Sequence, residues 1–309
     1  MKAFFEQQCA AYDTNDYWHI HQWNLQTIQA NARDTVIPLS PGSRKRKRGP
    51  DGEESDKDTK RPEPIFSTTT PREPSSEPYN YYEGITCAKQ LAETLPSFFQ
   101  RLPPSRTTTE SINSPWIYIC NPHTTWRPHE RISEFKQAGH ALLEGHKSLR
   151  HKMESSNPDK AVSTITRLLN PYRNRLELDL ASCARQHNVL SGKWMLFPSH
   201  AFVDQAWFKV AKATWEGRLG HAAKVALDAA DPHKDDHVIC IYTDDFTNKD
   251  DVLRVLRELK MMGLAHDGLD ERGIYYKADA YTYLDIKGQN EWRLKVSMYS
   301  SRDLLKGIR

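Results

Sequence analysis

The stretch that decides the fold reads GKWMLFPSHAFVDQAWFKVAKAT and spans residues 192–214. Its first part, Trp194–Phe197, is a short apolar run between Gly192 and Pro198, which predicts a buried strand. Ser199 then offers a helix N-cap. Apolar and small residues follow at the three- and four-residue spacing of an amphipathic helix, namely Phe202, Val203, Ala206, Trp207, Val210 and Thr214. A strand therefore leads directly into a helix.

Further elements extend this pattern in both directions. Apolar and β-branched runs predict strands over Trp116–Cys120, Ala222–Leu227, Val238–Tyr242, Tyr275–Ile286 and Trp292–Met298. Helical periodicity covers residues 131–153 and about 159–188, the second with a break near Asn170-Pro171. A further helix has Thr247 as its predicted cap and Gly263 as its stop. The order lacks βαβ regularity, so we expect an α+β domain with a mostly antiparallel sheet and helices on one face.

Composition divides the chain into three parts. The mean hydropathy is −0.74 and 38% of residues are hydrophobic, which is too polar for a chain that folds from end to end. Residues 1–34 are rich in aromatic side chains and form a predicted N-terminal arm, residues 35–79 form a predicted disordered linker, and residues 84–305 form the folded domain. No long apolar run or apolar leader is present, so neither a membrane span nor secretion is expected.

The linker carries two basic clusters, Arg44-Lys45-Arg46-Lys47-Arg48 and Lys60-Arg61. Their spacing is typical of a bipartite nuclear import signal that an import receptor reads. A merely solvated charge run is the alternative, and direct contact with nucleic acid is disfavoured by the acidic spacer Asp51–Glu54. We therefore expect a protein of the nucleus and cytoplasm.

Motifs for catalysis are absent from the sequence. It contains no nucleophile elbow, P-loop, dinucleotide-binding glycine motif or zinc-protease motif. The five cysteines form no C-x-x-C pair, and a bound metal or cofactor is not expected. An enzyme acting on a nucleotide is disfavoured because no acid–base pair is visible.

One tryptophan differs from the others in its surroundings. Trp126 lies in a polar, proline-rich loop after the first strand, beside Arg127. An exposed indole next to a cation suits base stacking, which contributes about 1–3 kcal/mol per base. A loop Trp folded over a hydrophobic edge is the alternative interpretation.

The element order resembles that of the cap-binding translation initiation factor 4E. In that family a strand leads to a loop with the first cap-stacking Trp, as Trp116–Cys120 leads here to Trp126. The strand and the Phe-Trp helix that follow resemble Gly192–Phe197 and Val203–Phe208. The resemblance implies a curved sheet with a ligand site on its concave face. The family's second stacking Trp and its Glu have no counterpart near Ser182–Arg185, so methyl-cap specificity is not implied.

Several stretches are more closely similar to the family of the basophilic leukaemia expressed protein. These are Lys193–Phe197, Ala223–Val225 and Lys277–Leu284. That family has an initiation-factor-4E-like fold and no established activity, so the resemblance implies the fold and leaves the activity open.

These observations favour a non-catalytic module that binds RNA or a nucleotide. Trp126 and Tyr242 would stack on bases, and phosphates would meet Lys224, Arg293 and Lys295. The alternative is a protein-interaction domain that kept the fold without the ligand.

Overall fold

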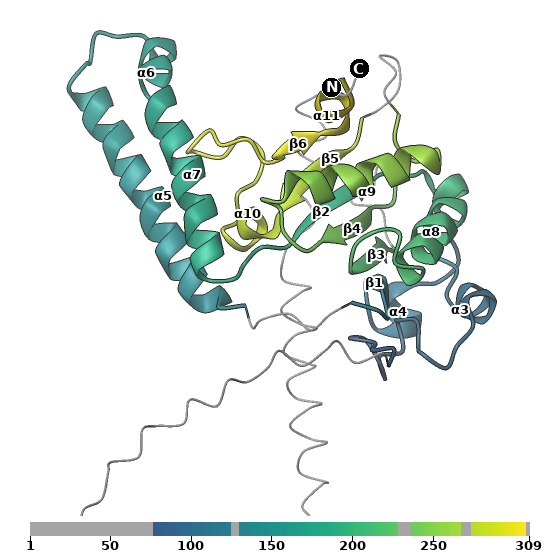
Figure 1. Ribbon diagram of the computed structural model, residues 1–309. Coiled ribbons are helices and arrows are strands. Elements are labelled where there is room, and N and C mark those ends of the chain that lie inside the picture. Colours follow the sequence, from purple (N-terminus) through teal and green to yellow (C-terminus); the bar gives the residue numbers. More distant parts are fainter. Residues whose placement is uncertain (1–76, 125–129, 228–235, 267–272, 307–309) are drawn as a thin grey trace, which may run out of the picture. The chain divides into compact units, whose positions relative to one another are not determined.

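The computed structural model describes residues 77–124, 130–227, 236–266 and 273–306. They form an α+β fold around one six-stranded antiparallel sheet (Figure 1). Its strands are β1 (Trp116–Cys120), β2 (Gly192–Leu196), β3 (Ala222–Ala226), β4 (Ile239–Thr243), β5 (Tyr275–Ala278) and β6 (Tyr299–Ser300). The predicted fold class is confirmed. The predicted N-terminal arm and all but the last three residues of the predicted linker lie outside the described residues.

The strands follow the spatial order β1-β3-β4-β2-β5-β6. Every pair is antiparallel, so the register fixes which side chains share a face. The outer side of β1 is covered by the preceding chain, because Tyr118 N donates to Cys87 O at 3.0 Å and Lys89 N donates to Tyr118 O at 3.1 Å. These two bonds satisfy backbone groups at an edge that would otherwise be exposed to pairing with other chains.

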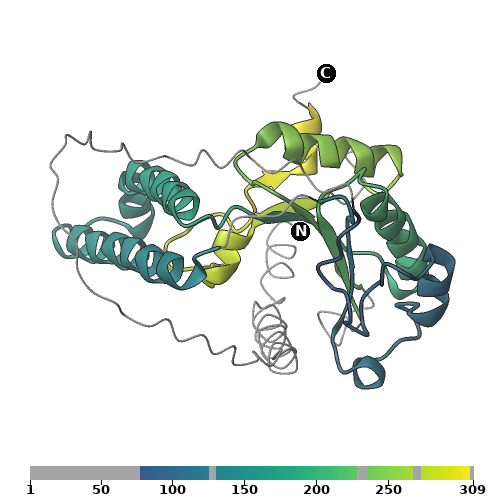
Figure 2. The ribbon, with the colours of Figure 1, turned by 60° about the horizontal axis from the view of Figure 1, so that its bottom comes forward.

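Two helices cover one face of the sheet, α8 (His200–Trp215) and α9 (Lys249–Met261) (Figures 1 and 2). Trp207 of α8 and Trp194 of β2 are fully buried between the layers. The Trp194 indole N–H donates to Val252 O of α9 at 3.1 Å, which ties sheet and helix together. The predicted strand-to-helix unit at residues 192–214 is thus confirmed.

A helical hairpin, residues 131–187, contains α5 (Ile132–Ser155), α6 (Val162–Leu168) and α7 (Asn170–Gln186). Figure 1 shows α5 and α7 running side by side. Arg131 N donates to His187 O at 2.9 Å and closes the base of the hairpin. Lys147 of α5 pairs with Glu291 at 3.0 Å, which holds the hairpin against the chain after β5. The helix break predicted near Asn170-Pro171 is confirmed.

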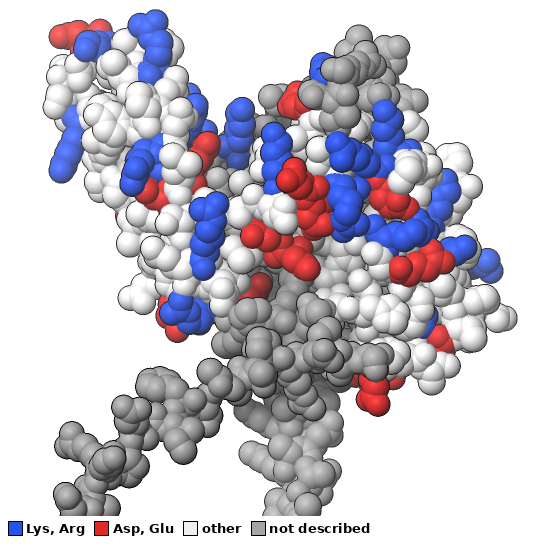
Figure 3. Space-filling view, in the orientation of Figure 1, with Lys and Arg blue, Asp and Glu red and all other residues white. Residues whose placement is uncertain are grey.

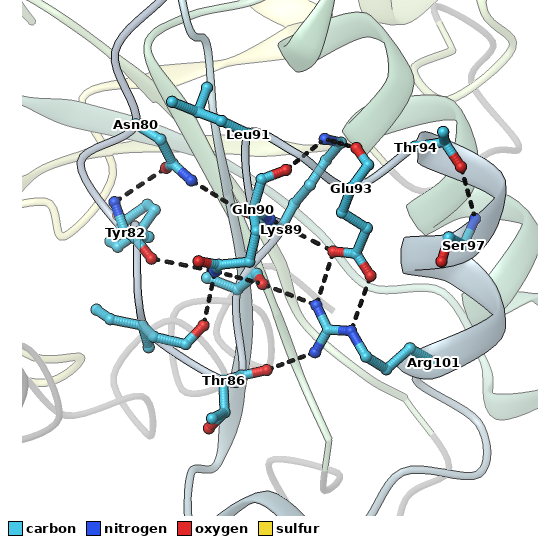
Figure 4. A network of polar contacts seen from close by, with 12 residues as sticks. Asn80, Tyr82, Thr86, Lys89, Gln90, Leu91, Glu93, Thr94, Ser97 and Arg101 are labelled. Atoms are coloured by element: carbon cyan, nitrogen blue, oxygen red, sulfur yellow. Dashed lines mark hydrogen bonds and ion pairs between the residues drawn. The ribbon is translucent and has the colours of Figure 1, made fainter.

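A polar network stabilises the segment before β1, which includes α3 (Leu95–Arg101) and α4 (Thr109–Ile112) (Figure 4). The Arg101 guanidinium binds both oxygens of Glu93 at 2.8 Å and donates to Thr86 O and Ala88 O. Lys89 is 1% exposed and donates to Gln90 O and Glu93 O. Its ammonium lies 3.3 Å from the ring centroid of Trp215, the last residue of α8. Burial of this lysine is therefore offset by two acceptors and an aromatic face.

Three local predictions are corrected. The N-cap of α9 is Asn248, whose side chain accepts from Asp251 N, because Thr247 instead donates to Asp245 through both its N–H and its hydroxyl. The strand predicted over Tyr275–Ile286 ends at Ala278, where α10 (Asp279–Tyr283) begins.

The third correction concerns Trp292–Met298, which is no strand. Arg293 has φ +54°, and Asn290 accepts from the backbone N–H groups of Arg293 and Leu294. This turn thus uses backbone N–H groups that a β-strand would need for hydrogen bonds to a neighbouring strand. The alternation still appears in burial, with Leu294 and Val296 buried and Arg293 and Lys295 exposed. Only β6 joins the sheet, followed by α11 (Ser301–Lys306). None of the helices described is long and apolar enough to cross a membrane.

Candidate functional site

The face of the sheet opposite α8 and α9 gathers lysines and aromatic rings. Trp194 points to α9, so its neighbour Lys193 points to the other face. The strand register aligns Lys193 with side chains from β1, β3, β4 and β5 in one row across the sheet, and a second row lies next to it on the same face. The first row reads Cys120, Ala222, Tyr242, Lys193, Lys277, and the second reads Tyr118, Lys224, Cys240, Met195, Tyr275.

We call the part of this surface formed by Lys193, Lys224, Lys277, Tyr118 and Tyr242 the lysine face. Three strands, β2, β3 and β5, supply one lysine each. A lysine in the middle of a strand is unusual, because its charge must leave bulk water when the sheet is covered. Three of them lie together on this one face of the sheet.

Specific contacts hold Lys193 and Lys224 in place. Lys193 Nζ lies 2.7 Å from Asp279 Oδ1, with side chains 12% and 11% exposed, and 5.5 Å from the ring centroid of Tyr242. Lys224 Nζ lies 3.8 Å from the ring centroid of Trp116. Lys277 is buried. Asp279 thus lies within hydrogen-bond distance of Lys193 and offsets its buried charge.

Tyr242 keeps its hydroxyl proton. Burial raises the pKa of Tyr242 well above its ordinary value, so its phenol stays a neutral donor. Its ring lies 5.7 Å from that of His221, whose Nδ1 is 3.0 Å from Asp244 Oδ1. The ring of Tyr118 lies 5.1 Å from that of Tyr82, in the segment before β1. Flat rings and a phenolic donor beside lysines can bind a planar, negatively charged group.

The structure brings together two of the five site residues predicted from the sequence. Tyr242 and Lys224 lie on the lysine face, on neighbouring strands β4 and β3. Arg293 and Lys295 belong to no strand and are exposed on the segment that leads to β6. Trp126 lies outside the described residues.

Sequence reasoning missed Lys193 and Lys277, and also their neighbour Asp279. A signal was present, since each lysine interrupts an otherwise apolar strand, as in Gly192–Leu196 and Tyr275–Ala278. Alternation alone places such a residue on the face opposite the apolar core. Only strand order shows that the two lysines are direct cross-strand neighbours.

Among the described residues, no three His, Cys, Asp or Glu side chains are grouped to hold a metal ion. The cysteines in the described ranges are Cys87, Cys120, Cys183 and Cys240, and all are buried free thiols. Burial raises the pKa of the Cys240 thiol, which keeps it protonated and unreactive. The lysine face therefore offers binding groups, namely ammonium, phenol and ring surfaces.

One comparison with known protein families gave a match over most of the chain. The family model described as Basophilic leukemia-expressed protein Bles03 matches residues 5–285. The match includes β1 to β5 and the hairpin, and so every residue of the lysine face.

Proposed function

The chain belongs to the Bles03 family, and we propose that it is a non-catalytic module whose lysine face binds a nucleotide or the 5′ end of single-stranded RNA. The observation that carries this proposal is the convergence of Lys193, Lys224 and Lys277 on one sheet face among tyrosine rings. A phosphate group can accept hydrogen bonds from several ammonium groups at once, so lysines from three strands on one face suit it.

The ligand class follows from the mixture of groups on the face. Lysines bind phosphates as point charges, and aromatic rings stack on bases without selecting one base. Tyr242 lies between Ala222 and Lys193 in its row, so its phenol is beside the cations. A ligand that combines a polyphosphate with a flat base matches both groups. Trp126 would add a second ring, as expected from its sequence surroundings.

Titration with short fluorescent RNAs tests this proposal. We compare 5′-triphosphate, 5′-hydroxyl and capped ends by fluorescence anisotropy. The triphosphate end should bind more tightly than the hydroxyl end. Lys224→Gln should weaken triphosphate binding by about tenfold or more, because a hydrogen bond to a charged group contributes about 1.5–3 kcal/mol.

Lys249→Gln is the matched control for that variant. It removes the same charge from an exposed position at the start of α9, on the opposite layer. Equal binding of triphosphate and hydroxyl ends, or equal losses in the two lysine variants, would contradict a phosphate site on the lysine face.

A protein-interaction domain is the second candidate function, favoured by exposed apolar side chains on the helical layer. Phe202 of α8 is 63% exposed and Met261 of α9 is 76% exposed. A cavity of about 290 Å³ lies in this region, lined in part by Phe202, Ala206, Lys209, Leu264 and Ile274. If no RNA or nucleotide binds and a protein partner binds with little dependence on salt, this second function replaces the first.

A further inference from the structure

The helical hairpin carries the net positive charge of the folded part of the chain. Residues 131–187 contain 10 Lys/Arg and 6 Asp/Glu, whereas the rest of residues 80–309 contains 22 of each. Figure 3 shows Lys and Arg side chains along the hairpin. The hairpin is therefore a cationic body attached to a neutral one, which favours an anionic partner.

Six of these ten cations form no ion pair with any residue in the described ranges, and one of the six, Arg131, donates instead to the backbone carbonyl of Gln186. Arg150, Arg175 and Lys147 pair with Glu154, Asp179 and Glu291. The other five without an ion pair are distributed over all three helices and the turn between α5 and α6: Lys152, Lys160, Arg167, Arg173 and Arg185. Such a distribution suits an extended anion more than a single small one.

A buried histidine points to a specific site within this surface. His146 is 8% exposed, and neither of its ring nitrogens has a hydrogen-bond partner in the described structure. It lies on the buried face of α5 with Phe135, Gly139 and Leu143, which packs on α7. A buried polar ring without partners destabilises a fold by about 1–3 kcal/mol, so a missing ligand is a physical explanation for its presence.

Burial, and then the positive charges of two guanidinium groups, lower the pKa of the His146 imidazole ring. The two guanidinium groups belong to Arg150 and Arg173. The imidazole is therefore neutral near pH 7, with one N–H donor and one acceptor nitrogen. Arg150 lies one turn after His146 on α5 and is bound to Glu154 through Nε at 2.9 Å. That bond orients the guanidinium and leaves its terminal N–H groups for a ligand.

We propose that His146, Arg150 and Arg173 form a phosphate-binding site on the hairpin, and that a backbone phosphate of single-stranded RNA occupies it. One imidazole N–H and two guanidinium forks match the oxygens of a phosphate. The unpaired cations beyond the site would then contact neighbouring phosphates of the same strand. This site is separate from the lysine face and needs no particular 5′ end.

A 5′-hydroxyl RNA isolates the hairpin site from the proposed end-binding site. Anisotropy titrations over a range of salt concentrations give the slope of log K against log salt. Each phosphate contact contributes about 0.7 to that slope for single strands. Arg173→Gln should reduce the slope by about 0.7, and adding Arg150→Gln should reduce it by about 0.7 again.

Arg175→Gln is the matched control, because it makes the same change two residues along α7 at a cation already paired with Asp179 at 3.0 Å. It should leave the slope nearly unchanged. Equal effects of Arg173→Gln and Arg175→Gln would overturn the site. Lys249→Gln, which lies outside both sites, should leave 5′-hydroxyl RNA binding unchanged. The preference for a triphosphate end and the salt slope of 5′-hydroxyl RNA are separate readouts, so failure of the lysine face and failure of the hairpin site are distinguishable.

The NMR signals of the His146 ring provide a second readout. Both inorganic phosphate and 5′-hydroxyl RNA should shift them, and Arg173→Gln should abolish both shifts. A shift with inorganic phosphate alone would overturn RNA as the occupant. An unchanged ring with both probes would overturn the site.

Discussion

Asp279→Asn tests how the lysine face is held together. The carboxylate of Asp279 lies 2.7 Å from Lys193 Nζ, and the two side chains are 11% and 12% exposed. Breaking a fully buried pair destabilises a protein by about 3–5 kcal/mol, and an exposed pair contributes only about 0.2–1 kcal/mol. Asn keeps an acceptor oxygen and loses only the charge. We therefore expect the free energy of unfolding to fall by about 2 kcal/mol.

Urea denaturation followed by circular dichroism measures this loss, with a melting temperature lower by about 4–8 °C as a second readout. Asp285→Asn is the matched control, since it makes the same change in an exposed pair with Lys287 at 2.8 Å, where the side chains are 64% and 42% exposed. The control should change stability by less than about 0.5 kcal/mol.

The same variant has a predicted effect of opposite sign on binding. Replacing the carboxylate removes one negative charge beside Lys193, so affinity for a triphosphate-ended RNA should rise while stability falls. Equal losses of stability for Asp279→Asn and Asp285→Asn would refute the structural reasoning. A fall in affinity would refute the role given to the lysine face.

Three other predictions concern the import signal, the loop indole and the hairpin. Replacing Arg44–Arg48 and Lys60–Arg61 by Ala should make a fluorescent fusion cytoplasmic, and an unchanged nuclear signal would remove the import hypothesis. Trp126→Ala should weaken RNA binding by about 1–3 kcal/mol without lowering the melting temperature. Trp194→Ala should instead lower the free energy of unfolding by about 3–5 kcal/mol. The affinities for RNAs with methylated and unmethylated caps should differ less than about tenfold. The lowered pKa of His146 means that, as the pH falls, the unfolded chain binds a proton at this residue before the folded protein does, so stability is lost below about pH 6.5. His146→Leu should reduce the loss of stability between pH 7.5 and pH 5.5, measured by urea denaturation. An identical pH dependence in the variant would contradict the lowered pKa of His146.

Local sequence determined most elements of this fold. The period of Phe202 to Thr214, the apolar run Trp116–Cys120 and the break before Pro171 depend on neighbouring residues only, and each was predictable. Gly263 has φ +69° and ends α9 as its position in the sequence indicates. Helix periodicity and turn residues are short-range properties, which is why they can be deduced without tertiary contacts.

Tertiary structure decided where backbone hydrogen bonds go and which side chains meet. The alternation of apolar and polar residues in Trp292–Met298 resembles that of a strand. Asn290 nevertheless accepts hydrogen bonds from the backbone N–H groups of Arg293 and Leu294, so Arg293 and Lys295 lie outside the sheet. Lys193, Lys224 and Lys277 are far apart in the sequence, and each is one lysine in an apolar strand. Their convergence requires the strand order and register, which arise from non-local pairing and from the packing of Trp194 on α9.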